Sequence, residues 1–174
     1  MRRNMFQEQA SSEAPRWAYD TTFFAALTAN LRLEVIGRTP EGYRINLFIE
    51  SGRVVGPRID AVIRPDGGDW LFVRPDGIAR PDIRITLETA DGALLLYRAD
   101  GVCDLGPDGY AKVAAGQFTG TPPFYATPTF VTAHPDWQWL NRCQGFGIGR
   151  VAMEQLQVQY DIYIPRVRDR LRDA

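Results

Sequence analysis

Residues 67–97 read GGDWLFVRPDGIARPDIRITLETADGALLLY, and this stretch decides the fold class. Two turns, at Asp76-Gly77 and Asp91-Gly92, separate three runs of strand-forming residues. Glycine suits such turns because it accepts the positive φ angle that they require. Asp-Gly turns flanked by alternating apolar residues are a strong hairpin signal. The stretch therefore predicts a meander of antiparallel strands over residues 70–73, 83–89 and 93–97.

Strand and turn signals continue along most of the chain. Residues 154–164 give the clearest alternation of apolar and polar side chains, and Pro165 is expected to stop that strand. A turn is expected at Ser51-Gly52, and a bulge or barrel corner at Gly56-Pro57. A short helix is predicted over residues 110–115, between two glycines. Further strands are predicted over residues 23–35, 43–50, 53–63 and 124–132.

About nine strands with short turns and little helix indicate a sandwich or a barrel. Sequential hairpins and the bulge signals favour an all-β fold with a single antiparallel β-barrel, and a barrel of about eight strands can hold one small ligand. A chain of 174 residues suits one domain. We expect an N-terminal arm over residues 1–20, the barrel over residues 21–165, and a charged, frayed tail over residues 166–174.

The charge balance and the cysteines limit the function classes. The net charge is −1 and the isoelectric point is near 5.8, so no basic surplus exists to neutralise the phosphates of a nucleic acid. No apolar run reaches the length of a membrane span, and residues 1–16 lack the apolar core of a signal peptide. Cys103 and Cys143 are expected to be reduced thiols, and the expected location is the cytoplasm.

Several spaced motifs resemble those of a known family. They are TPEGYRINLFIESGRVVGP at residues 39–57, GDW at 68–70, RPDG at 74–77, DIRITLETADGA at 82–93 and WLN at 139–141. In this order they make the chain resemble the domain of unknown function 3237 family, also called uncharacterised protein family 0311. The resemblance covers roughly residues 22–164. It implies a small, lipocalin-like antiparallel β-barrel and, for some members, a cofactor-free lyase, isomerase or cyclase.

The chain departs from the family pattern at three positions. Members usually carry Arg-Tyr where this chain has Arg84-Ile85, and they often have Arg where Tyr125 stands. A Glu is common in place of Val131. Apolar or aromatic groups thus replace polar ones, and these departures from the family pattern imply a more hydrophobic or aromatic ligand.

The common catalytic signatures are absent from the sequence: it contains no GxSxG, HExxH, P-loop or dinucleotide fingerprint. A single histidine cannot form a multi-histidine metal site, so we expect neither a metal nor a cofactor. His134 precedes a proline in a turn-like segment, which favours an exposed or capping role over that of a proton carrier at a pocket rim.

Two charged residues are candidates for catalysis. Asp69, between a glycine and a tryptophan, could be a general base whose pKa is raised at the barrel mouth, or it could accept backbone N–H bonds in the corner. Arg84 could be an internal cation that stabilises an oxyanion. It could also be an outward residue paired with Glu88 or a cross-strand acid. Its position in the best-matched family motif makes these two alternatives equal.

Aromatic residues could wall a pocket, although aromatic residues are more often core. Tyr125 is a third catalytic candidate: Arg84 together with Tyr125 or Tyr97 would stabilise the oxyanion. Asn141 could orient a substrate oxygen or cap the turn at residues 139–141. The expected substrate-binding residues are Trp70, Tyr97, Trp137, Trp139 and Asn141.

These residues lead to two hypotheses about function. The first is a cofactor-independent enzyme of lyase, isomerase or cyclase type, in which Asp69 takes a proton from a small hydrophobic or aromatic metabolite bound inside the barrel. The second is a non-catalytic binding protein for the same ligand class. The expected partners are that small molecule and, as an option, further copies of the chain in a homodimer or higher homo-oligomer.

Overall fold

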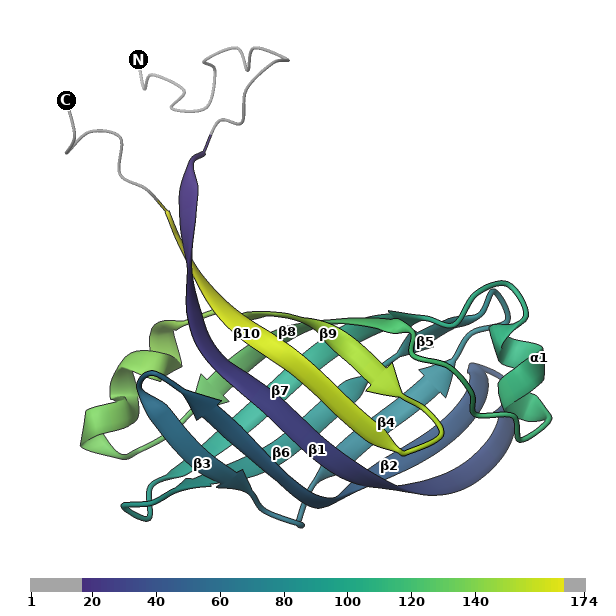
Figure 1. The fold of residues 1–174 in the computed structure, drawn as a ribbon, viewed down its shortest axis with the longest axis horizontal. Coiled ribbons are helices and arrows are strands. Elements are labelled where there is room, and N and C mark those ends of the chain that lie inside the picture. Colours follow the sequence, from purple (N-terminus) through teal and green to yellow (C-terminus); the bar gives the residue numbers. More distant parts are fainter. Residues whose placement is uncertain (1–16, 168–174) are drawn as a thin grey trace, which may run out of the picture.

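The computed structural model of the protein describes residues 17–167, and these residues form a closed antiparallel β-barrel (Figure 1). Ten strands are found in this part of the chain, together with one short α-helix and one 3-10 helix. Neither helix is long and apolar enough to cross a membrane. The elements are β1 (Tyr19–Thr39), β2 (Gly42–Gly56), β3 (Ile59–Ile63), β4 (Gly68–Val73), β5 (Ile78–Arg80), β6 (Asp82–Thr89), β7 (Leu94–Asp104), α1 (Gly109–Ala114), β8 (Pro123–Val131), η1 (Pro135–Arg142), β9 (Phe146–Ala152) and β10 (Gln157–Val167).

The ring closes because the first strand is hydrogen-bonded on both sides. β1 pairs with β10 along one edge and with β2 along the other. From β2 the ring continues through β3 and β4 to β6, and then through β7, β8 and β9 back to β10. All of these pairings are antiparallel, which confirms the fold class predicted from the sequence. Closure removes the unpaired edges that an open sheet would expose.

Both predicted Asp-Gly turns join paired strands. The turn at Asp91-Gly92 connects β6 to β7, and the turn at Asp76-Gly77 connects β4 to β5. The short strand β5 was not expected from the sequence. The α1 helix begins at Gly109 and matches the helix predicted over residues 110–115 to within one residue.

The expected turn at Ser51-Gly52 is wrong, because β2 runs through this pair without interruption. The register between β1 and β2 shifts there: Asn30 faces Ser51, while Leu31 faces Ile49. This bulge changes which positions of β2 point inward. In the sequence, it appears as a break in the alternation of apolar and polar residues, and such a break resembles a turn. The expected strand over residues 53–63 is instead the end of β2, a turn at residues 57–58, and β3.

The expected stop at Pro165 is also wrong. β10 continues to Val167, and Pro165 faces Thr21 of β1 in the ladder. Likewise, β1 already begins at Tyr19, inside the expected N-terminal arm. The remainder of that arm, residues 1–16, and the end of the expected tail, residues 168–174, lie outside the described residues.

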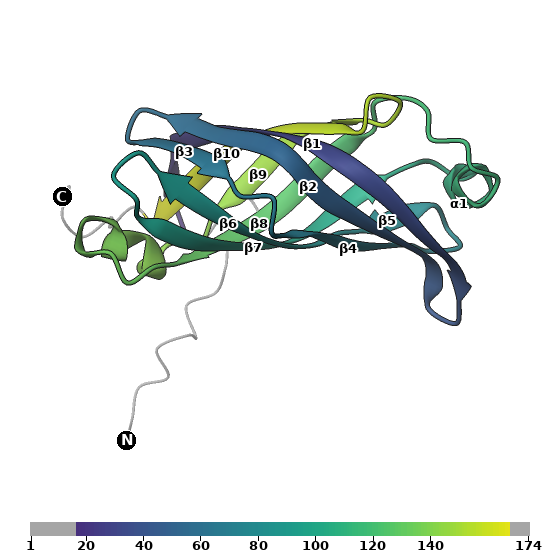
Figure 2. The ribbon, with the colours of Figure 1, turned by 90° about the horizontal axis from the view of Figure 1, so that it is seen from below.

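The two ends of the barrel are built differently (Figure 2). Aromatic side chains fill the interior near η1: Phe24 packs edge-on against Phe130 and against Trp139, with ring centroids 5.4 and 5.9 Å apart. Tyr97 packs against Phe130 in the same way. The opposite end carries α1, which buries Val113. Packed aromatic rings therefore occupy the interior near η1.

The two turn glycines give a matched test of the fold. Gly77 and Gly92 have φ angles of +83° and +81°, so alanine would be strained by about 1–2 kcal/mol at either. A Cβ at Gly77 would also meet the Gly106 carbonyl oxygen, whereas nothing lies within 4 Å of a Cβ at Gly92. We expect Gly77→Ala to lower the free energy of unfolding by about 1–3 kcal/mol more than Gly92→Ala. Denaturant unfolding measures both variants, and equal losses would contradict this packing of the Asp76-Gly77 turn.

Candidate functional site

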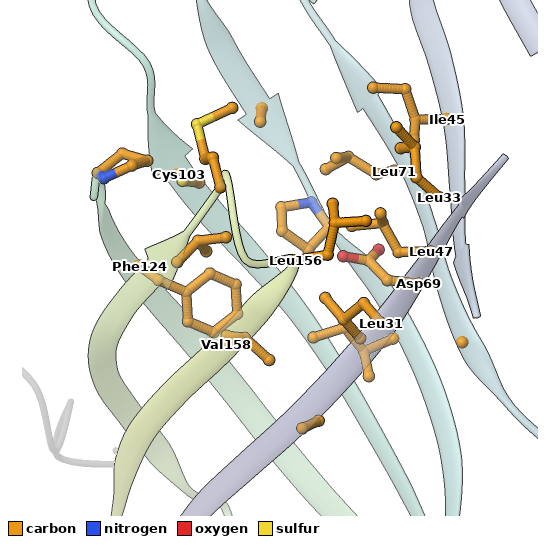
Figure 3. A pocket seen from close by; sticks show the side chains of 18 of the residues that line it. Leu31, Leu33, Ile45, Leu47, Asp69, Leu71, Cys103, Phe124, Leu156 and Val158 are labelled. Atoms are coloured by element: carbon orange, nitrogen blue, oxygen red, sulfur yellow. The ribbon is translucent and has the colours of Figure 1, made fainter. Parts of the chain in front are cut away.

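A cavity lies inside the barrel toward the α1 end (Figure 3). Its volume is about 90 Å³, counted as the space open to the centre of a water molecule. One water needs roughly 10–15 Å³ on that measure, so the cavity has room for a small organic molecule. Its wall is apolar except for three side chains that can ionise: Asp69, Cys103 and Tyr160.

Two glycines position Asp69. A Cβ at Gly68 would lie 2.6 Å from the Leu47 carbonyl oxygen of β2, and a Cβ at Gly67 would meet the Arg84 carbonyl oxygen of β6. Only glycine lets the start of β4 approach both neighbouring strands so closely. Alternation along β4 then sends Asp69 and Leu71 inward. In Figure 3 the Asp69 carboxylate points into the cavity beside Leu47 and Leu156.

The environment of Asp69 raises the pKa of its carboxyl group to about 7. The largest cause is desolvation, because the surface that the side chain still exposes faces an apolar cavity. The negative charge of Asp82 adds to the increase, while the Asp82 backbone N–H opposes it by donating to Asp69 Oδ1 at 2.8 Å. The carboxylate thus accepts a backbone N–H, as one sequence-based alternative expected, and it also faces the cavity, while its role as a general base stays a prediction.

Tyr160 supplies the second polar group of the cavity. Its hydroxyl oxygen lies 2.6 Å from that of Tyr97, and either hydroxyl can be the donor. Burial raises the pKa of both phenols above their ordinary value, so both stay neutral at physiological pH. When Tyr97 donates, the Tyr160 proton is not used in this hydrogen bond. Tyr97 itself is fully buried and does not line the cavity.

Cys103 is the third ionisable group of the wall. Burial raises the pKa of its thiol to about 12, and the charges of Asp104 and Asp69 contribute to the increase. The nucleophilic form of a cysteine is the thiolate. The Cys103 thiol therefore stays protonated at neutral pH and is a poor nucleophile.

Three residues expected in the pocket point outward instead. Arg84 is on the outer face of β6, where 60% of its side chain is exposed and both Asp82 carboxylate oxygens lie 3.1 Å from its nitrogens. Trp70 and Tyr125 are 37% and 44% exposed. The physical reason is the alternation of each strand: the neighbours of these residues already point inward, so these residues cannot. Neither Arg84 nor Tyr125 can touch a ligand inside the barrel.

The predicted residues of the WQWLN segment lie in η1, away from the cavity. Trp139 packs on Phe24, and the Arg58 guanidinium lies 4.4 Å from the centre of its ring. Asn141 holds the chain together locally, because its amide donates to and accepts from the Thr132 backbone at 2.9 and 2.8 Å. Trp137 is half-buried and packs against the core. None of these residues lines the cavity, so their expected role in binding a ligand there is wrong.

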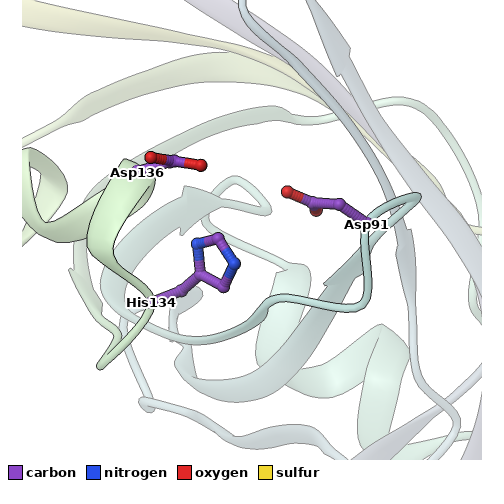
Figure 4. A group of neighbouring side chains, drawn as sticks. All are labelled: Asp91, His134 and Asp136. Carbon is purple, nitrogen blue, oxygen red and sulfur yellow. The ribbon is translucent and has the colours of Figure 1, made fainter.

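One group of side chains near η1 has the donors for a metal ion (Figure 4). One ligand atom from each of Asp91, His134 and Asp136 lies within 4.8 Å of the other two. Asp91 and Asp136 are exposed, and Asp91 already accepts a hydrogen bond from the Thr89 hydroxyl, which lowers the pKa of its carboxyl group. Exposed acidic groups commonly gather in this way without an ion, so we assign no metal to this group.

Cys103 and Tyr160 line the cavity but were not predicted from the sequence. The alternation over residues 154–164 is consistent with an inward Tyr160, but nothing in that pattern distinguishes a cavity from a packed core. Of the three departures from the family pattern, only Ile85 lines the cavity, whereas Tyr125 and Val131 are exposed. The alternation of β7 and β10 could have identified Cys103 and Tyr160, because it shows which positions of these strands point inward as Asp69 does.

Comparison with known proteins agrees with this architecture. A family model described as "Protein of unknown function (DUF3237)" matches residues 16–164. A curated relative from Clostridium acetobutylicum, named a UPF0311 protein, is 29% identical over 125 residues, which are 70% of this chain and 78% of the relative.

Two solved structures have the same fold. A protein with unknown function from Clostridium acetobutylicum aligns with a TM-score of 0.75 at 24% identity and covers 86% of this chain and 100% of that one. A β-barrel-like protein from Acinetobacter baumannii aligns with a TM-score of 0.71 at 25% identity, covering 90% of this chain and all of that one. The names of these proteins specify no activity.

The raised pKa of Asp69 makes stability depend on pH. The folded state holds this proton more tightly than the unfolded state, whose carboxyl has its ordinary pKa near 3.8. The contribution of Asp69 is therefore most favourable below about pH 4 and is lost as pH rises through about 7. The folded and unfolded pKa values of Asp69 differ by about three, which corresponds to about 4 kcal/mol of unfolding free energy. This value is an upper limit, because water in the cavity would hydrate the carboxylate.

The Asp69→Asn variant isolates this effect, because its amide oxygen can still accept the Asp82 N–H. We expect Asp69→Asn to gain stability relative to the wild type as pH increases from 4 to 8. Urea unfolding at several pH values measures the difference. A constant difference across this range would show that Asp69 has an ordinary pKa.

The tyrosine pair predicts a second, asymmetric effect. Tyr160→Phe leaves the fully buried Tyr97 hydroxyl without a partner, which costs about 1–3 kcal/mol. Tyr97→Phe should cost less, because the Tyr160 hydroxyl can meet water in the cavity. The double variant should lose less stability than the two single losses added together, as a double-mutant cycle measures. Additive losses would mean that the two hydroxyls do not interact.

Proposed function

The chain belongs to the DUF3237 family of proteins of unknown function, and on that premise we propose that it is a cofactor-independent enzyme of lyase, isomerase or cyclase type. Its substrate would be a small hydrophobic or aromatic molecule bound in the barrel cavity. The observation that carries this proposal is Asp69: a carboxyl group in an apolar cavity whose pKa is raised to about 7. A general base or acid works best when its pKa lies near the operating pH.

Asp69 would act on a carbon acid, which is a carbon that carries a proton next to a carbonyl group. Desolvation strengthens the carboxylate as a base. The Asp82 N–H holds the carboxylate in place by donating a hydrogen bond of 2.8 Å to Asp69 Oδ1. The electron pair of the broken C–H bond would move toward the carbonyl oxygen, giving an enolate. Return of the proton to another carbon completes an isomerisation, and loss of a leaving group completes an elimination.

The enolate oxygen would need a hydrogen-bond donor, and Tyr160 is the candidate in the wall. When the Tyr160 hydroxyl accepts a hydrogen bond from Tyr97, that bond polarises the Tyr160 hydroxyl and makes it a better donor to a ligand. Donors fixed before the reaction stabilise developing charge without reorganisation. In this proposal Tyr160 replaces Arg84 and Tyr125 as the oxyanion donor, and Tyr97 positions it.

A non-catalytic binding protein for the same ligand class is the alternative. The apolar wall suits this role equally, since apolar walls with few polar groups are typical of small-molecule sites. Asp69 separates the two functions, because a binding protein for apolar molecules has no use for a carboxyl group that titrates near neutrality. A cavity that binds a ligand but moves no proton would favour the alternative.

Proton abstraction can be tested before the natural substrate is identified. An apolar ketone such as 2-tetralone exchanges its α-protons for deuterium in D₂O, and NMR measures the rate. We expect the protein to accelerate this exchange, and Asp69→Asn to lower the acceleration by about 10²–10⁴-fold, the range of general acid–base catalysis. The rate should increase with pH up to about 7 and then level off as Asp69 becomes fully deprotonated.

Arg84→Gln is the matched control, because Arg84 is a charged residue of the neighbouring strand that lies on the outer face. It should leave the exchange rate unchanged. Binding of the ketone with no exchange above that of buffer would contradict the enzyme and support the binding protein. An equal loss in Arg84→Gln and Asp69→Asn would contradict the assignment of Asp69.

We also propose a cytoplasmic location. Both cysteines are free, Cys103 buried and Cys143 half-buried, as suits a reducing compartment.

A further inference from the structure

A second, smaller hollow adjoins the cavity at the α1 end of the barrel. Its volume is about 50 Å³ on the same measure. Four residues line both spaces: Leu105, Val113, Pro122 and Met153. The smaller hollow therefore lies directly outside the cavity, and we take it as the mouth. Its rim includes one charged side chain, that of Lys112 in α1.

Lys112 is unusual for this chain. The sequence contains a single lysine beside 19 arginines. In residues 17–167, each ion pair of the structure uses an arginine, and Lys112 belongs to none of them. Its exposed ammonium group is thus available at the mouth, whereas other cations of the barrel already have partners. Arg150, for example, donates to the Thr121 carbonyl oxygen at 3.0 Å.

The interior of the cavity cannot compensate a negative charge on a ligand. No basic side chain of residues 17–167 lines it, and Asp69 would repel an anion. A carboxylate moved from water into an apolar space without a partner costs several kcal/mol. An anionic group on a bound ligand is therefore stable only at the mouth, where water and the Lys112 ammonium both reach it.

We propose that Lys112 holds the anionic group of the substrate at the mouth of the barrel, while the apolar body of the substrate lies in the cavity beside Asp69. The substrate class is then a small, apolar organic acid that carries a carboxylate or phenolate at one end. This inference rests on the proposed function for the site, and it adds which end of the molecule enters first. Lys112 is a specificity residue in this arrangement and takes no part in proton transfer.

Lys112 also lies in the last turn of α1, where a positive charge suits the helix end. That structural role would not change the ligand preference of the cavity. Lys112→Gln removes the charge with a residue of similar helix propensity. Arg150→Gln is the matched control, since it removes one positive charge from β9 near the same loop, and Arg150 does not line the mouth.

Calorimetric titration with 2-naphthylacetic acid and its neutral amide tests the proposal. We expect the wild type to bind the acid more tightly than the amide. Lys112→Gln should weaken binding of the acid about fivefold and leave the amide unchanged, the effect of one partly exposed charge pair. Added salt should reduce the preference of the wild type for the acid. Arg150→Gln should keep that preference.

The single lysine allows a direct measurement on the same site. Reductive methylation with ¹³C-formaldehyde gives one lysine signal, distinct from that of the α-amino group, and the acid should shift it whereas the amide should not. Equal affinities of the wild type for acid and amide, an unshifted signal, or equal losses in both variants would overturn the role of Lys112. Binding of neither probe would overturn both this role and the proposed ligand class. Retained acid preference with no deuterium exchange would overturn the proposed enzyme alone.

Discussion

A carboxyl group held inside an apolar barrel is the constraint on which the rest of the structure depends. Asp69 can face the cavity only because Gly67 and Gly68 let β4 approach β2 and β6 at the same point. The pleat then turns Asp69 inward and Trp70 outward. The same approach brings the first N–H of β6 to Asp69 Oδ1. One glycine pair therefore fixes both the place of the carboxyl group and the hydrogen bond that limits the cost of burying it.

Asp82 connects the inside of the barrel to its surface. Its backbone N–H stabilises the charged form of Asp69, while its own carboxylate raises the pKa of Asp69 and pairs outside with Arg84. These effects oppose each other, and desolvation exceeds them both. Arg84, expected from the sequence as a catalytic cation, contributes instead to the exposed pair beside this junction. Such an exposed pair adds little to stability, since solvent screens it.

The sequence predicted the class of fold because hairpin turns and strand alternation are local. The Asp91-Gly92 turn and the inward face of β10 needed no knowledge of distant residues. The site was predicted less well, because Asp69 and Trp70 were both assigned to the pocket although neighbours on a strand face opposite sides. The bulge in β2 and the continuation of β10 through Pro165 depend on pairing with β1, which no local pattern contains. Which inward residues line a cavity depends on how the ends of the barrel are filled.

The two ends of the barrel are filled differently: aromatic side chains pack one end, and the other end holds the cavity. At the η1 end, aromatic rings pack against one another inside the barrel, so burial there stabilises the closed ring. At the α1 end, aliphatic side chains leave a cavity, and the wall forgoes the contacts that a packed core would make. Tyr97 and Tyr160 join the two regions, because Tyr97 belongs to the aromatic core and its partner faces the cavity. The aromatic core thus holds the Tyr160 hydroxyl in place through Tyr97, and in the proposed function this fixed position would make Tyr160 a preorganised donor to a bound molecule.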